Sequence, residues 1–291
     1  MVFAIAQKAD RFLTYVLSDS KTNAELEIVP ERGGIVTQWR IGKDDILYLD
    51  KERFLDPQLS IRGGIPILFP ICGDLPNNAY TYQGTSYSLP QHGFARNLPW
   101  QVTQQDTQNA AELTLTLQQT PETLAVYPFE FQIDFTYRLR GNQLEIIQRY
   151  TNRSDDLMPF STGLHPYFNV PDKSKLQVEI PATQFQRKGE PSVHPFDGTF
   201  DFREPEIDVA FMDVSAPVAA VADPVQNYKL VLRYDPLYST LVFWTVFGKD
   251  YYCLEPWSAP RNAINTGKHL THLEPGVSLE TSVSLHIEPL S

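Results

Sequence analysis

Two residues in this 291-residue chain are well suited to acid–base chemistry, and they lie ninety positions apart. His165 and Glu255 each sit among aromatic and apolar neighbours. A poorly hydrated carboxyl group has a raised pKa, which suits a general base near neutrality, and an imidazole titrates in the same range. A single histidine in such surroundings is more often a hydrogen-bonded core residue. The glutamate is the stronger candidate of the two.

Two further segments and one isolated acid carry side chains that can bind a polar ligand. Arg62 precedes two glycines, which let the backbone turn tightly and bring the guanidinium close to a ligand. Gln91, His92 and Arg96 lie within six positions of one another. A surface ion pair would explain Arg62 equally well, and a loop bonding its own backbone would explain the second segment. Asp208 is the weakest candidate, because an acid in a strand-like run often faces water.

Several common enzyme signatures are absent from the sequence. It contains no P-loop, no GxGxxG after a strand, no HExxH and no GxSxG. His269 and His272 precede Glu274 at a spacing that could ligate a metal, but no clear further ligand accompanies them. We therefore expect neither a metal nor a cofactor, which leaves acid–base chemistry or simple ligand binding.

Composition limits the partners that this chain could have. Its net charge is −11, from 24 basic and 35 acidic residues, and no dense Lys/Arg cluster is present. This argues against a nucleic acid or an anionic membrane as the main partner. No apolar run approaches the ~20 residues of a membrane helix, and no signal peptide is evident. Cys72 and Cys253 lie far apart and outside any metal-binding spacing, so we expect reduced thiols and a cytoplasmic protein. We also expect the protein to be a monomer or a weak homodimer.

Hydrophobic residues alternate with polar ones along most of the chain, which is typical of β-strands with one buried face. Six hydrophobic residues occupy every second position from Phe129 to Leu139, and the Gly141–Asn142 turn that follows predicts a hairpin. Strand-like runs recur at short intervals, broken by 23 prolines and 15 glycines. Pro181–Pro224 is the most irregular segment, and we interpret it as long loops. The pattern predicts an all-β fold, a large antiparallel β-sandwich forming a single domain over residues 1–291.

Four segments together resemble the aldose 1-epimerase (galactose mutarotase-like) superfamily. They are RGGIPILFPICG, PQHGFAR, TGLHPYF and YCLEPW, and their order and separation fit the family along nearly the whole chain. PQHGFAR is closest to the branch that contains glucose-6-phosphate 1-epimerases and related bacterial sugar epimerases. The residues after Glu255, from Pro256 to Arg261, depart from the pattern of the galactose enzymes and leave the preferred sugar open.

The resemblance implies a β-sandwich with a sugar site in a cleft on one face. It implies that His165 and Glu255 are catalytic. By the same carry-over, the substrate-binding positions are Arg62, Gln91, His92, Arg96 and Asp208.

The expected reaction is interconversion of the α and β anomers of a hexose or hexose phosphate through ring opening. It needs one base at the C1 hydroxyl and one acid at the ring oxygen. Two alternatives remain: a non-catalytic or regulatory carbohydrate-binding sandwich, and a glycoside hydrolase, which usually needs two carboxylates.

Overall fold

The computed structural model describes residues 2–290, and these are mostly β-strands joined by short turns. The first sheet is antiparallel, in the order β1 (Phe3–Ala9), β2 (Leu13–Asp19), β3 (Ala24–Val29), β4 (Ile35–Ile41) and β5 (Asp44–Asp45). The second has the order β16 (Gln177–Glu179), β20 (Val218–Asp223), β21 (Tyr228–Tyr234), β25 (Ser278–Pro289), β12 (Gln143–Asn152), β11 (Phe131–Arg140), β10 (Ala111–Gln118) and β9 (Gln101–Asp106).

The third sheet carries the strands that matter for the site. Its order is β18 (Val193–Pro195), β17 (Gln184–Arg187), β19 (Glu206–Phe211), β22 (Thr240–Val246), β23 (Tyr251–Trp257), β14 (Gly163–Leu164) and β6 (Ile67–Leu68), and β15 (Tyr167–Asn169) also pairs with β23. Two small pairs complete the strands, β7 (Ala79–Tyr82) with β8 (Thr85–Ser88), and β13 (Met158–Phe160) with β24 (Thr271–Leu273).

Helices are few and short. They are α1 (Lys51–Leu55), α2 (Pro121–Val126), α3 (Ala263–Thr266) and the 3-10 turns η1 (Pro30–Arg32), η2 (Pro76–Asn78), η3 (Ala95–Asn97) and η4 (Lys173–Lys175). Among residues 2–290 no helix is long and apolar enough to cross a membrane. The expected all-β fold, a large antiparallel β-sandwich, is confirmed.

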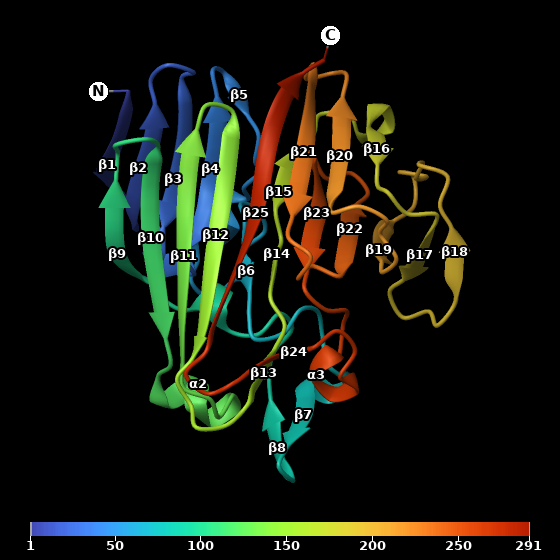
Figure 1. The fold of residues 1–291 in the computed structure, drawn as a ribbon. Helices are drawn as coiled ribbons and strands as arrows, with labels where there is room; N and C mark the ends of the chain where they lie inside the picture. The colour runs from blue at the N-terminus through green and yellow to red at the C-terminus, as the bar shows by residue number, and fades with distance from the viewer. Residues whose placement is uncertain (1, 291) are drawn as a thin grey trace.

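The strands form two layers with an apolar core between them. In Figure 1 the second sheet lies in front, and the first and third sheets lie side by side behind it. On β11 the alternating side chains from Phe131 to Leu139 are buried, and the predicted hairpin to β12 forms with Arg140 opposite Gln143. This buried face exists because the side-chain period of a strand is two.

One sequence interpretation was wrong. Pro181–Pro224, expected as long loops, contains β17, β18, β19 and β20. Each of these strands has six residues or fewer, so the alternation is too brief to stand out between prolines and acidic turn residues.

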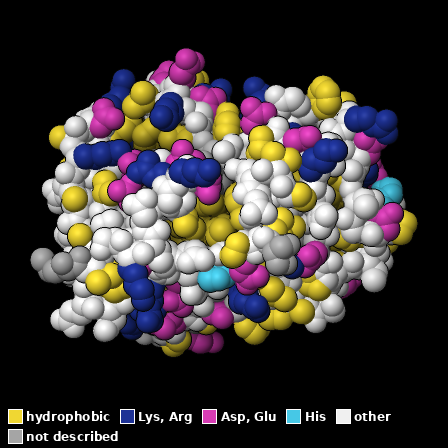
Figure 2. Space-filling view, turned by 90° about the horizontal axis from the view of Figure 1, so that it is seen from above, with side chains coloured by type: hydrophobic (Ala, Val, Ile, Leu, Met, Phe, Trp, Pro, Cys, Tyr) yellow, Lys and Arg dark blue, Asp and Glu magenta, His cyan; other side chains and the backbone are white. Residues whose placement is uncertain are grey.

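Surface charge is mixed rather than segregated. Figure 2 shows Lys and Arg side chains interspersed with Asp and Glu over the face seen from above, with hydrophobic side chains between them. The face seen in Figure 2 shows no broad basic area.

A glycine fixes the loop that carries His92 against the third sheet. Gly93 has φ +69° and forms a bridge with Phe69, next to β6. A Cβ atom at this position would lie 2.2 Å from the Phe69 carbonyl oxygen. The Phe69 carbonyl is part of the backbone, so it cannot move aside as the end of a flexible side chain would.

We expect Gly93→Ala to lower the free energy of unfolding by at least about 3 kcal/mol, because a steric clash is added to the cost of a left-handed alanine. Gly84→Ala is the matched control, since Gly84 has φ +80° but a Cβ there meets nothing within 4 Å. The control should lose only about 1 kcal/mol. Denaturant unfolding measures both, and equal losses would show that the close approach is unimportant.

Candidate active site

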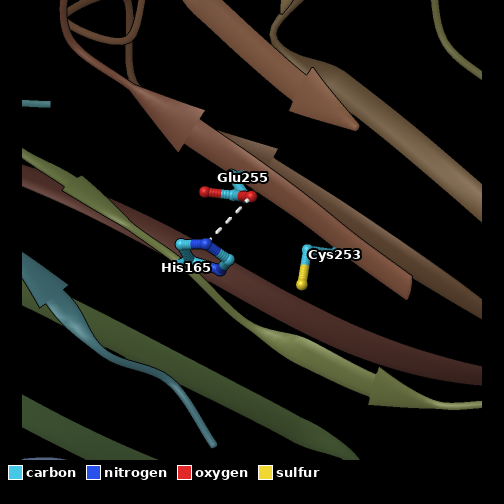
Figure 3. Close-up of side chains that lie close together, drawn as sticks. All are labelled: His165, Cys253 and Glu255. Atoms are coloured by element: carbon cyan, nitrogen blue, oxygen red, sulfur yellow. Dashed lines mark ion pairs between the residues drawn. The ribbon is translucent and has the colours of Figure 1, made fainter. Parts of the chain in front are cut away.

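His165 and Glu255 face one another across two paired strands. Gly163 in β14 pairs with Trp257 in β23, and Tyr167 in β15 pairs with Cys253 in the same strand. His165 lies midway between the two pairings and therefore stands opposite Glu255. The two side chains point toward each other in Figure 3, and the distance from His165 Nε2 to Glu255 Oε1 is 3.4 Å.

Both members of this pair are buried but border a pocket. His165 is 7% exposed and Glu255 is 1% exposed. The pocket has a volume of about 170 Å³, and its wall includes all seven residues that the sequence analysis named as site candidates: Arg62, Gln91, His92, Arg96, His165, Asp208 and Glu255. Residues from positions 62 to 255 thus converge on one cavity.

Each catalytic candidate is held by a neighbour. The indole Nε1–H of Trp257 donates to Glu255 Oε2 over 3.0 Å, which leaves Oε1 facing the imidazole. The His165 ring stacks on Tyr167 with the ring centroids 4.8 Å apart. Its backbone N–H donates to the Pro66 carbonyl. These contacts restrict the side-chain conformations of Glu255 and His165.

Burial shifts the two pKa values in opposite directions. Desolvation raises the pKa of Glu255 well above its usual range, and the nearby charge of Asp208 raises it further. Desolvation lowers the pKa of His165 well below its usual range, and the guanidinium groups of Arg96 and Arg62 add to this. Low hydration thus favours the neutral form of each group, while their mutual attraction favours the ion pair.

Arg62 and Arg96 line the pocket without a carboxylate partner. Arg62 lies over the Trp244 ring, 5.3 Å from its centroid, and Arg96 donates to the Gln91 carbonyl over 2.8 Å. Within residues 2–290 no carboxylate oxygen lies within ion-pair distance of either guanidinium. Their charges remain available to a ligand.

The structure shows that Asp208 and His92 also have partners inside the protein. The Asp208 carboxylate accepts a 2.6 Å hydrogen bond from Arg261 and lies 3.8 Å from Lys188 Nζ. His92 Nδ1 accepts from the Gly73 backbone N–H over 3.0 Å. Desolvation lowers the pKa of His92 well below its usual range, so the ring is neutral.

Lys188, Glu206, Tyr167, Trp244, Trp257 and Arg261 also line the pocket and were not among the predicted site residues. Trp257 had a usable signal, since period two places it on the same face of β23 as Glu255. Lys188 and Arg261 follow β17 and β23 on loops, where no periodicity indicates which way a side chain points.

One group of side chains within residues 2–290 has the atoms and spacing to hold a metal ion. The ligand atoms of His165, Cys253 and Glu255 all lie within 4.8 Å of one another (Figure 3). Burial raises the pKa of the Cys253 thiol well above its usual range, which disfavours the thiolate that a metal requires. His269 and His272, the spacing weighed in the sequence, are exposed and belong to no such group there.

Cys72 and Cys253 are both free and buried, and they belong to the same small apolar cluster.

Comparison with known proteins gives a consistent relationship. The model of the aldose 1-epimerase family matches residues 15–286. Slr1438 protein from Synechocystis sp. PCC 6803 is 48% identical, with a TM-score of 0.95 over 98% of this chain and 99% of that one. A galactose mutarotase-like protein from Clostridium acetobutylicum is 22% identical, with a TM-score of 0.83 over 99% of each chain, and shows the fold alone.

A curated relative from Escherichia coli (strain K12) carries the name "Putative glucose-6-phosphate 1-epimerase". It is 30% identical over 149 residues, which cover 50% of this chain and 46% of the relative. The matched region therefore spans about half the length of that relative.

The raised pKa of Glu255 predicts a pH-dependent cost of folding. Above the pKa of a glutamate in the unfolded chain, the unfolded state loses its proton while the folded state keeps it, so stability falls as pH rises. Glu255→Gln removes this titration. Its melting temperature relative to wild type should therefore increase from pH 5 to pH 8, by a difference equivalent to at least about 1 kcal/mol.

Glu52→Gln serves as the control, because Glu52 is exposed on α1. Its effect on melting temperature should be the same at both pH values. A relative stability of Glu255→Gln that stays constant or decreases toward pH 8 would contradict the assigned shift.

Proposed function

The chain belongs to the aldose 1-epimerase family, and on that premise we propose that it interconverts the anomers of an aldohexose, with Glu255 and His165 as the acid–base pair. The observation that supports this most is the 3.4 Å approach of the two side chains at the edge of a pocket. A base and an acid at this separation can serve two oxygens bonded to the same carbon, the C1 hydroxyl and the ring oxygen.

Ring opening moves two protons. Ionised Glu255 takes the proton of the C1 hydroxyl, and the C1–O5 bond breaks as protonated His165 donates to the ring oxygen. The aldehyde rotates about C1–C2. Closure on its other face returns both protons, because O5 gives its proton to His165 and the C1 oxygen takes one from Glu255. Each group supplies about 10² to 10⁴ in rate.

The pair holds one proton throughout this cycle. It is an ion pair while the sugar is cyclic and a neutral pair while the sugar is open. Coulomb attraction across 3.4 Å stabilises the first form, and the desolvation that shifts both pKa values stabilises the second. Because these effects oppose one another, neither the ion pair nor the neutral pair is much more stable than the other. This suits a reversible reaction with a small change in free energy.

We further propose that a phosphorylated hexose is the better substrate. Arg62 and Arg96 offer two guanidinium forks at the pocket without carboxylate partners, and such forks match the oxygens of a phosphate. The relative named for a glucose-6-phosphate reaction agrees with this choice. A neutral hexose would leave both guanidinium groups without an anionic partner.

Glu255→Gln and His165→Asn should each lower the rate of anomer exchange by at least about 10². Polarimetry of freshly dissolved α-D-glucose and NMR exchange spectroscopy of glucose 6-phosphate measure this rate above the uncatalysed one. Unchanged melting curves would show that the fold survives. Wild-type exchange by Glu255→Gln would refute the assignment, and a non-catalytic sugar-binding protein would then be favoured.

Arg96→Ala should reduce kcat/KM for glucose 6-phosphate by about 10- to 100-fold, since a hydrogen bond to a charged group contributes about 1.5–3 kcal/mol. The value for free glucose should change less than about threefold. Arg233→Ala is the control, because Arg233 is exposed on β21, away from the pocket. Equal losses on the two substrates would show that Arg96 does not recognise phosphate.

A further inference from the structure

We propose that Trp257 is the positioning residue of this site, which fixes the Glu255 carboxylate through the indole N–H and presents its second oxygen to the reaction. This rests on the proposed function, since it assigns a role at the same glutamate. The two residues are two positions apart on β23, so their side chains leave the strand on the same face. The 3.0 Å hydrogen bond from Nε1 to Oε2 joins them there.

The hydrogen bond divides the two carboxylate oxygens between two tasks. Oε2 accepts from the indole, and Oε1 lies 3.4 Å from His165 Nε2. A carboxylate turns freely about its terminal torsion unless a partner holds it. An indole N–H can only donate, so it favours the ionised carboxylate that the base must present.

The Trp257 ring is itself enclosed by its neighbours. The Arg261 guanidinium lies over it, 5.0 Å from the ring centroid, and His92 meets it at a 5.5 Å centroid distance in a T-shaped arrangement. A Cβ atom at Gly163 would lie 2.8 Å from the ring. The ring has little room to rotate, so the direction of its N–H is fixed.

Two carboxylates in turn fix the guanidinium above the ring. Arg261 donates to Asp208 over 2.6 Å and to Asp74 over 3.3 Å. A continuous set of contacts thus runs from Asp208 through Arg261 and Trp257 to Glu255. This gives Asp208 and His92 a task that needs no contact with the sugar.

The test compares two tryptophans with the same chemistry. Trp257→Phe removes the donor to Glu255, and Trp100→Phe removes an indole N–H that donates to the Ala95 carbonyl over 3.0 Å, outside the pocket. For Trp257→Phe we expect kcat to fall about 10- to 100-fold with KM changed less than about threefold. The acidic limb of the kcat/KM profile should move to higher pH, because the ionised carboxylate has lost a donor.

The matched variant Trp100→Phe, which also removes a buried indole donor, should leave the position of the acidic limb unchanged. If Trp257→Phe does not fold, benzothienylalanine at position 257 keeps the bicyclic shape and removes only the N–H. A wild-type kcat and acidic limb in either 257 variant would overturn the inference, as would the same shift in Trp100→Phe. If Glu255→Gln abolishes exchange while a 257 variant behaves as wild type, only the positioning role fails. Activity retained by Glu255→Gln would remove the proposed function itself.

Discussion

The site depends on the pairing of β14 and β15 with β23, which places an imidazole and a carboxyl group opposite one another where water is excluded. Gly163 pairs with Trp257 and Tyr167 pairs with Cys253, one on each side of His165. These two pairings fix the position of His165 along β23, opposite Glu255. The sheet therefore sets the distance between the two groups, and the desolvation sets their proton affinities. The proposed acid–base chemistry needs both effects, since exposed groups keep their ordinary pKa values.

Precision at such a site comes from rigid neighbours rather than from the pair itself. The aromatic wall of Tyr167, Trp244 and Trp257 packs edge to face and in stacks around His165 and Glu255. Aromatic rings lose little conformational entropy when they are ordered, and each fills a large volume. They hold the polar groups in position and keep bulk water out, so hydrogen bonds within the pocket are stronger than they would be in water.

The sequence was sufficient to predict the sheet content and seven of the fifteen residues that line the pocket, but by different routes. Alternation from Phe131 to Leu139 predicted β11 directly, because a strand buries every second side chain. Local sequence made Arg62, Gln91 and Arg96 candidates for ligand binding, but only the resemblance placed them in one site, since no local pattern shows that loops so far apart meet. Neither the alternation pattern nor the resemblance identified Lys188 or Arg261. The partners of Asp208 are a tertiary property, and its predicted contact with the sugar remains untested.

The charges at the pocket run against those of the whole chain, and this difference supports the proposal of a phosphorylated substrate. The net charge is −11 overall, whereas the pocket wall carries Arg62, Arg96, Lys188 and Arg261 against Glu206, Asp208 and Glu255. Asp208 is engaged by Arg261 and Lys188, and the raised pKa of Glu255 limits its negative charge. Of the two remaining guanidinium groups at the pocket, that of Arg96 is half-buried and that of Arg62 is exposed, so solvent screens the Arg62 charge more strongly. If the substrate is phosphorylated as proposed, its phosphate would supply the anionic partner that both guanidinium groups lack, through charge-assisted hydrogen bonds.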